Sequence, residues 1–275
     1  MTTTLRPTEP LQHNADGTRS RHYQVCVNSR PVGAIHLGTS PTFGDSVARI
    51  HELRIEEPDQ RRGRGTVAAL AAEEVARGWG CREIEAVGVP ASAEAALRLV
   101  KALGYVLRNR GMVKQLGDTP PELPAGSQAR PMTQADFDAW LVHESEDYAR
   151  TWMARGVPEP EARAKSQRDH DTLLPQGLTT ENMQFSILEH EGTRVGVLWF
   201  ALRDGKPYIF DVEADEAHRG RGHGRTLMLL AETQAHALGE RTLGLNVFAG
   251  NTAAERLYES LGYETTQYAF YKPLL

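Results

Sequence analysis

Two carboxylates in the second half of the chain have a spacing that could serve acid–base chemistry. Asp211 and Glu213 lie two apart on a segment with strand character, residues 207–214, so both should face one side, about 6.5 to 7 Å apart. Either could act as a general base, directly or through a water molecule, although such carboxylates are also typical of a solvated face. The alternation places Ile209 on their side. The opposite face then carries Phe210, Val212 and Ala214.

A glycine-rich turn follows these carboxylates. Residues 219–224 read Arg-Gly-Arg-Gly-His-Gly, and apolar residues at helical spacing come after them. Glycine tolerates tight backbone turns, and the first turn of a helix presents unpaired N–H groups and a partial positive charge. The pattern predicts a site for a phosphate or pyrophosphate, although it is also typical of a flexible loop. We interpret His223 as a spacer between the glycines.

A third candidate group lies in the last predicted helix, residues 252–261. Asn251 immediately precedes it and is a typical N-cap, and Thr252 with Glu255 has the spacing of a capping box. Tyr258 has helical spacing to three apolar residues, Ala254, Leu257 and Leu261. It could therefore be a core aromatic residue, but packing alone would give its hydroxyl no task.

The chain must position these groups within a duplicated α/β unit. Gly63 and Gly65 recur 159 residues later as Gly222 and Gly224, and Leu103-Gly104-Tyr105 recurs 158 residues later. We predict an N-terminal domain at 1–117, a Pro-rich linker at 118–128 and a C-terminal domain at 129–275. The predicted strands of the first half are 4–7, 22–27, 32–37, 48–55 and 83–89, with a loop at 12–21 and helices after Gly65 and at 92–103.

The two halves differ where chemistry is expected. Asn251 and Tyr258 correspond to Ala93 and Val100, so the first half lacks both polar groups. The positions that match the carboxylate pair are Glu52 and Arg54, so one carboxylate is lost as well.

The second half also contains material that the first half lacks. Two predicted helices, 134–155 and 159–174, stand where the first half has a short polar loop. The first carries a cluster whose acidity would suit a cationic amine, although charge runs are usually solvated: His143, Glu144, Glu146, Asp147 and Tyr148.

Composition excludes several classes of protein. The 275 residues carry a net charge of −5, with no polybasic block, so we expect no nucleic-acid partner. Cys26 and Cys81 are too few for a disulfide framework, and the histidines have no metal-ligand spacing, so we expect no metal. No apolar run approaches about 18 residues and the N-terminus has no signal-peptide core, which predicts a soluble, cytoplasmic protein without a membrane partner.

The two motifs together resemble the coenzyme A binding core of the GNAT N-acetyltransferase superfamily. The resemblance rests on Arg-x-x-Gly-x-Gly at 219–224 and Asn-x-x-Ala-x-x-Leu-Tyr-x-x-x-Gly-Tyr at 251–263. It implies two tandem GNAT-fold domains, each a mixed, mostly antiparallel twisted sheet flanked by helices. The first half resembles the same fold with a usable turn and a degraded final helix.

The resemblance also implies a role for each residue of the site. Tyr258 would protonate the leaving thiolate, and Asp211 or Glu213 would help to remove the proton from the attacking amine. Strand residues Val212 and Ala214 would pair with the pantetheine arm of acetyl-CoA. The other residues implied to bind the cofactor are Arg219, Gly220, Arg221, Gly222, His223, Gly224, Arg225 and Asn251.

These residues lead to three hypotheses about function. The first is an acetyl-CoA-dependent N-acetyltransferase that acts, without a metal, on a primary amine of a small molecule or peptide, with catalysis in the C-terminal domain. The second is a non-catalytic acyl-CoA-binding or sensing protein, and the third is a phosphate-binding interaction protein of unrelated chemistry. Because two fused units could supply the pairing that single-domain relatives obtain by dimerising, we expect a monomer or a homodimer.

Overall fold

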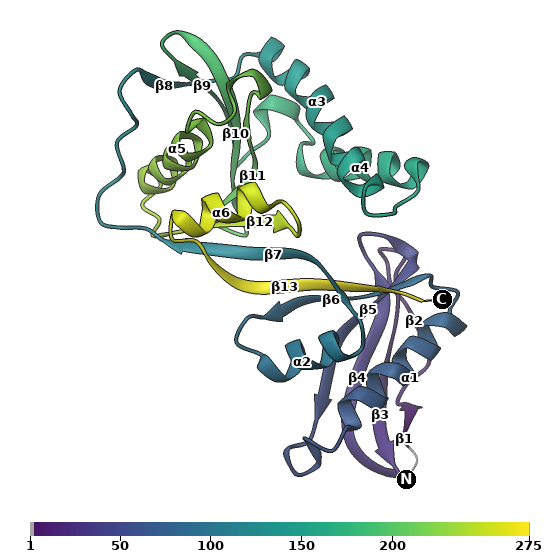
Figure 1. Cartoon of the computed structure of the whole chain (residues 1–275). Helices are drawn as coiled ribbons and strands as arrows, with labels where there is room; N and C mark the ends of the chain where they lie inside the picture. The colour runs from purple at the N-terminus through teal and green to yellow at the C-terminus, as the bar shows by residue number, and fades with distance from the viewer. Residues whose placement is uncertain (1–2, 275) are drawn as a thin grey trace. The chain divides into compact units, whose positions relative to one another are not determined.

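The structure is a computed structural model that describes residues 3–274 (Figure 1). It forms two compact units: unit 1 comprises, of the described residues, 3–110 and 265–274, and unit 2 comprises residues 111–264. Each unit has the predicted fold, a mixed and mostly antiparallel sheet flanked by helices. The units divide the chain differently from the predicted boundaries at 117 and 129, which describe the sequence repeats and stay a prediction.

Unit 1 is built on a sheet with the strand order β1-β3-β4-β5-β6-β13. Its strands are β1 (Thr3–Pro7), β2 (Gln12–His13), β3 (Arg19–Val27), β4 (Arg30–Ser40), β5 (Gly44–Ile55), β6 (Glu83–Pro90) and β13 (Glu264–Pro273). β5 and β6 pair in parallel, the other strand pairs given for the described part of unit 1 are antiparallel, and β2 pairs with β3. Its helices are α1 (Arg64–Gly78) and α2 (Glu94–Ala102), with a short 3₁₀ turn η1 (Glu57–Asp59).

The last strand of the chain therefore completes the sheet of unit 1. β13 follows α6 of unit 2 directly in sequence but pairs antiparallel with β6, with Phe270 opposite Ala86. An unpaired edge strand leaves its backbone N–H and C=O groups without partners, and this pairing satisfies them. Lys272 on β13 also contacts buried Glu73 on α1, with 2.7 Å between Nζ and Oε2.

Unit 2 has the strand order β7-β12-β11-β10-β9-β8. Its strands are β7 (Val106–Gln115), which begins in unit 1 and enters unit 2 at Gly111, β8 (Ser127–Pro131), β9 (Met183–His190), β10 (Thr193–Arg203), β11 (Lys206–Ala214) and β12 (Thr242–Phe248). Its helices are α3 (Gln134–Met153), α4 (Glu159–Leu173), α5 (His223–Ala237) and α6 (Thr252–Ser260), with 3₁₀ turns η2 (Gly177–Thr179) and η3 (Glu216–His218).

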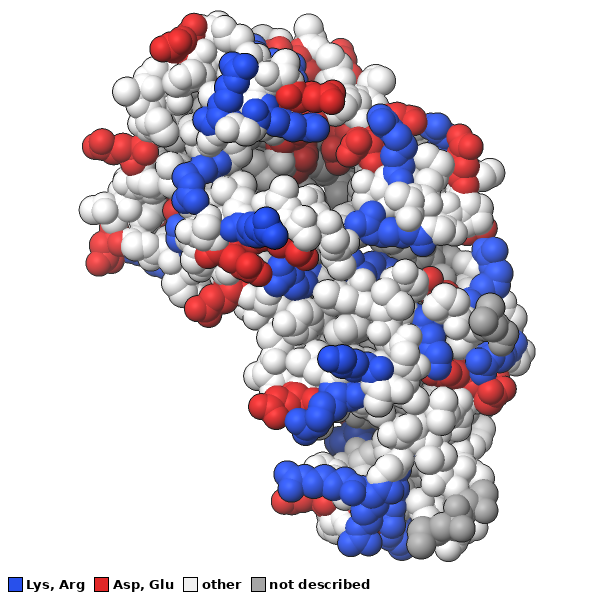
Figure 2. All heavy atoms as spheres, in the orientation of Figure 1, with Lys and Arg blue, Asp and Glu red and all other residues white. Residues whose placement is uncertain are grey.

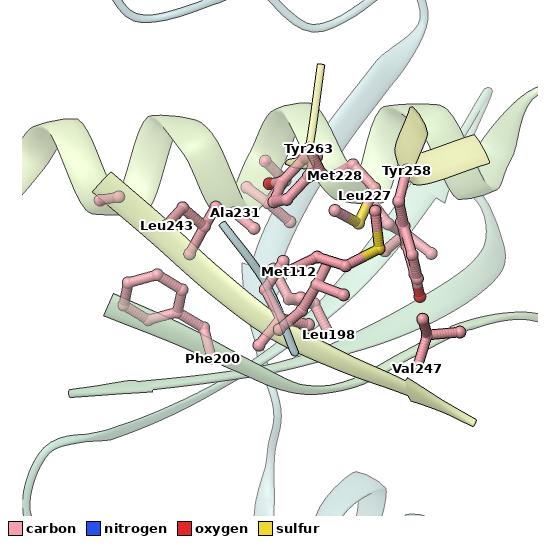
Figure 3. Packing of buried hydrophobic residues seen from close by; sticks show 14 of the residues in the cluster. Met112, Leu198, Phe200, Leu227, Met228, Ala231, Leu243, Val247, Tyr258 and Tyr263 are labelled. Atoms are coloured by element: carbon pink, nitrogen blue, oxygen red, sulfur yellow. The ribbon is translucent and has the colours of Figure 1, made fainter. Parts of the chain in front are cut away.

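Helices cover both faces of the sheet in unit 2. On one face α5 and α6 bury a large core against the strands, in which Figure 3 shows Leu227 and Met228 over Leu198. On the other face α3 packs Phe137 and Trp140 against aromatic residues of β9 and β10. Complete burial of side chains of this size contributes about 1.5 to 3 kcal/mol each.

Most predicted elements are present, with differences at their ends. The segment 12–21, predicted as a loop, contains β2 and the first residues of β3. The last two residues of the predicted linker, Ser127 and Gln128, belong to β8, where Ser127 pairs with His190. Both differences concern polar residues on edge pairings, where hydrophobic alternation gives no signal.

Candidate active site

A β-bulge interrupts β11 at the candidate carboxylates. Trp199 on β10 lies opposite Asp211, whereas the next residue, Phe200, lies opposite Ile209, so Phe210 has no partner in the register. The predicted alternation is therefore wrong on one side of the bulge: Ile209 packs in the same core as Val212, on the face of α5 and α6. An extra residue in one strand reverses the facing of everything beyond it.

Beyond the bulge, β11 parts from its parallel neighbour β12. The two strands pair only at Tyr208 with Gly244 and at Ile209 with Leu245. The backbone of β11 from Asp211 onward therefore has no ladder partner on the β12 side within residues 3–274. Groups from both faces of the sheet can meet where the strands part, because no ladder closes the space between them.

The glycine-rich turn leads directly into α5, as predicted. Gly222 is the N-cap, and its φ of 89° lies in the left-handed region that favours glycine. The cap has no side-chain hydrogen bond, and the first bond of the helix runs from Thr226 N to Gly222 O, 3.1 Å. The first amides of α5 therefore remain available to an anion, at the positive end of the helix dipole.

Arginines fix the turn to its surroundings. Arg219 donates from Nε to Ala214 O (3.2 Å) and from Nη2 to Glu213 Oε1 (3.1 Å), which ties the turn to the end of β11. Arg225 donates to Ser260 Oγ on α6 (2.6 Å). Arg221 is exposed, and His223 is buried as the first residue of α5, with its ring 5.3 Å from that of His190.

The two carboxylates of β11 both face α3. The indole of Trp140 donates to Asp211 Oδ2 (3.2 Å), and His143 Nε2 lies 3.0 Å from Glu213 Oε2. The prediction that the two carboxylates share a face is confirmed. Trp140 and His143 were not predicted as their partners, since their positions one turn apart on α3 matter only once α3 lies along β11.

The two carboxylates have different surroundings. Asp211 is held by one neutral donor, and burial together with the charges of Glu213 and Asp147 raises its pKa to about 6. Glu213 is bound on both oxygens, by His143 and by Arg219. Asp211 can therefore take up and release a proton near neutral pH.

Asn251 and Tyr258 lie on α6, as expected. Asn251 is the N-cap and accepts from Ala254 N (3.2 Å), so the predicted capping box of Thr252 and Glu255 is not the device that starts this helix. Tyr258 is 7% exposed and packs in the core of α5 and α6.

The hydroxyl of Tyr258 differs from the rest of its ring. Figure 3 shows the ring extending from α6 with its oxygen beside Val247 of β12. No residue among 3–274 bonds to this hydroxyl, yet it is absent from the fully buried, unpartnered polar atoms, which include the hydroxyl of Tyr263. Burial and the nearby charge of Asp211 raise the pKa of Tyr258, which keeps it protonated.

Other features lie away from these groups. A shallow hollow of about 410 Å³ lies at the far end of α5, lined by Asp118, His236 and Arg241 among others. Within residues 3–274, no three His, Cys, Asp or Glu side chains are arranged to hold a metal ion. No helix of the described chain is long and apolar enough to cross a bilayer. Basic and acidic side chains are interspersed on the face shown in Figure 2.

Comparison with known proteins gives the family. The family model described as "Acetyltransferase (GNAT) family" matches residues 2–105 and again residues 138–263. A mycothiol acetyltransferase of Mycolicibacterium smegmatis is 31% identical over 90% of this chain and 81% of its own length. An uncharacterized N-acetyltransferase of Bacillus subtilis is 31% identical over 52% of this chain and 96% of its own length.

Solved structures show the same fold. An N-acetyltransferase from Sphaerobacter thermophilus, 20% identical, covers 92% of this chain and 80% of its own, with a TM-score of 0.56. A tandem GNAT protein from the clavulanic acid biosynthesis pathway, 19% identical, covers 94% and 84%, with a TM-score of 0.51. With the parted strands, the glycine turn and the two family matches, this chain belongs to the acetyltransferase (GNAT) family as a tandem GNAT acyltransferase.

Proposed function

We propose that unit 2 transfers the acetyl group of acetyl-CoA to a primary amine, with Asp211 as the base and Tyr258 as the acid. The family uses acetyl-CoA. The observation that carries this proposal is the unbonded hydroxyl of buried Tyr258, close enough to Asp211 for the carboxylate charge to raise its pKa. The proposed base, Asp211, and the proposed acid, Tyr258, thus lie where β11 and β12 part.

The chain offers backbone groups for the pyrophosphate and the pantetheine arm of acetyl-CoA, and one side-chain amide for a further contact. The first amides of α5, His223 to Arg225, would hold the pyrophosphate, with Gly220 and Gly222 shaping the turn. The free backbone edge of β11 at Val212 and Ala214 would pair with the pantetheine amides. The side-chain amide of Asn251, whose oxygen caps α6, would contact the cofactor through its nitrogen.

Proton transfer accounts for the two side chains. Acetyl-CoA supplies a thioester carbon, and attack on it requires a neutral amine. The N–C bond forms as the C–S bond breaks, and the ammonium nitrogen loses two protons. Asp211 takes the first, and Tyr258 gives its own proton to sulfur and regains the second from nitrogen. Holding all groups in one place supplies a large part of the rate.

Asp211 suits the role of base better than Glu213. A base must be free to bind a proton, and Glu213 already has a partner on each oxygen, His143 and Arg219. We assign Glu213 the positioning of the turn through Arg219.

Unit 1 has a similar turn but not these two groups. Gly63 caps α1 with a φ of 74°, as Gly222 caps α5. At the positions of Asn251 and Tyr258 it has Ala93 and Val100, and Val100 is buried in an apolar core. We propose that unit 1 does not catalyse the reaction.

The test incubates the full chain and acetyl-CoA with each amine of a panel and measures the release of the coenzyme A thiol. The panel includes the acceptor of the mycothiol acetyltransferases, because those relatives match 90% of this chain. We expect amine-dependent thiol release, and acetyl-CoA at 100 times its Kd should stabilise the protein by about 2.7 kcal/mol. Thermal stabilisation without turnover of any amine would contradict the proposal and favour a non-catalytic acyl-CoA-binding protein.

A further inference from the structure

Three carboxylates beside the parted strands have no basic partner. Within residues 3–274, no Lys, Arg or His lies within ion-pair distance of Glu144, Asp147 or Asp211. Neighbouring carboxylates are paired: Glu213 with Arg219, and Asp169 with Lys165. The three carboxylates thus differ from these two neighbours.

Helix geometry brings the three carboxylates together. The bonds from Trp140 to Asp211 and between His143 and Glu213 lay α3 along β11. Glu144 follows Trp140 by four residues, and Asp147 follows His143 by four, so both lie one turn further along the same face of α3.

Burial and nearby negative charge keep Glu144 protonated in the free protein at neutral pH. Burial raises the pKa of Glu144 to about 10, and the charges of Asp211 and Asp147 add to this effect. A cationic ligand can take the place of this proton, because it neutralises the negative charge that holds the proton there.

A second observation places a ligand here. Tyr258 is more than nine-tenths buried, and its hydroxyl, which no described residue bonds, lies within reach of the Asp211 charge. Because its oxygen is not among the fully buried, unpartnered atoms, a ligand can reach it and supply the missing hydrogen bond. The charge of Asp211 acts on both Tyr258 and Glu144, so these groups lie near one another, where the proposed acceptor amine would bind.

We propose that the acceptor carries a second positive charge besides the amine that is acetylated, as a diamine, a polyamine or an amino sugar with two amino groups does. The inference rests on the proposed function. One ammonium gives a proton to Asp211, and the neutral amine then attacks the thioester, releases the thiol and becomes the amide. The other stays charged and pairs with Asp147 and with Glu144, whose proton it displaces into solvent.

The test compares two amines of equal chain length, 1,5-diaminopentane and n-pentylamine. The expected kcat/KM is at least about tenfold higher for the diamine, equivalent to about 1.4 kcal/mol. In Glu144→Gln/Asp147→Asn this ratio should fall toward one. Glu146→Gln is the matched control, because Glu146 lies on α3 but pairs with Arg163 on α4 (2.6 Å), and it should keep the ratio.

The outcomes separate this inference from the proposed function. Equal acetylation of both amines would overturn the inference and leave the acetyltransferase proposal standing, and so would a ratio that the double variant does not change. If neither amine is acetylated, calorimetry with 1,5-diaminopentane alone decides. Binding that the double variant weakens and Glu146→Gln does not would support recognition of a dication, and no binding would overturn it.

Discussion

The two units carry three stacked rings at the same place in their sheets, but the rings differ. In unit 2 Phe185 and Trp199 stack at 5.8 Å between centroids, and Trp199 stacks on Phe210 at 4.7 Å. In unit 1 the stack is His22, His36 and His51, at 4.0 and 4.6 Å. In both units a β-bulge lies directly after the middle ring, Trp199 in unit 2 and His36 in unit 1. The bulge leaves the residue of the third ring, Phe210 or His51, without an opposite residue on the neighbouring strand.

The cover on this face explains the difference. In unit 2 the rings lie under α3 and belong to an apolar cluster. In unit 1 the described helices α1 and α2 both pack on the opposite core, and His22 keeps 53% of its side chain exposed. Imidazoles stack as flat rings yet tolerate water. The backbone geometry is thus shared, while the face that carries chemistry in unit 2 is polar in unit 1.

Replacement of the carboxylate at the bulge should have the largest effect on turnover, and it should do so in unit 2 but not in unit 1. Asp211→Asn removes the proposed base and should lower kcat by about 10² to 10⁴. Glu52→Gln changes the counterpart in unit 1, opposite His36, and should leave turnover within about twofold. Steady-state kinetics with the best amine of the panel measures both, and equal losses would contradict the assignment of catalysis to unit 2.

The next largest expected effect is the change of kcat with pH. Because the pKa of Asp211 is raised to about 6, the carboxylate is protonated below that pH, and kcat should fall about tenfold per pH unit there. The groups that set this value are Trp140, His143, Asp147, Glu213 and the neighbouring Glu144.

Asp147→Asn removes one of these negative charges and should move the acid limb of the profile to lower pH. A limb that stays in place in this variant would contradict Asp211 as the titrating group.

The caps of the two final helices offer a reciprocal test of stability. Asn251 and Ala93 have nearly the same backbone angles, φ −79° and ψ 67° against φ −83° and ψ 65°, but only Asn251 bonds to its helix. Asn251→Ala should cost about 1 kcal/mol, and Ala93→Asn should gain a similar or smaller amount. Chemical denaturation measures both, and a loss of stability in Ala93→Asn would show that the two caps are not equivalent.

The histidine stack should make unit 1 sensitive to acid by a smaller amount. Burial and neighbouring imidazoles lower the pKa of His51 from 6.5 to about 4, so the unfolded chain binds more protons between these values. Stability is present above pH 6.5 and is lost as the pH falls. Solvent screening limits the effect to about 1 kcal/mol or less.

His51→Phe, which copies the ring of unit 2, should reduce the loss of melting temperature between pH 7 and pH 5. An unchanged acid sensitivity in this variant would mean that other groups cause it.

The sequence predicted the duplicated fold, the turn and its helix, and the N-cap Asn251, because these depend on local spacing and residue type. It could not predict the bulge that moves Ile209 away from Asp211, since a bulge leaves no periodic mark. It also missed the last strand in unit 1, which depends on pairing with β6, far away in sequence. The partners Trp140 and His143 required the packing of α3 to be known.

The central claim is that catalysis resides in unit 2, with Tyr258 as the acid. The most direct measurement is kcat for Tyr258→Phe, with the Kd for acetyl-CoA measured in parallel. Phenylalanine keeps the ring in its core and removes only the hydroxyl. We predict a fall in kcat of about 10² or more with the Kd changed by less than about twofold. A variant that acetylates every amine of the panel as fast as the parent protein would contradict the account.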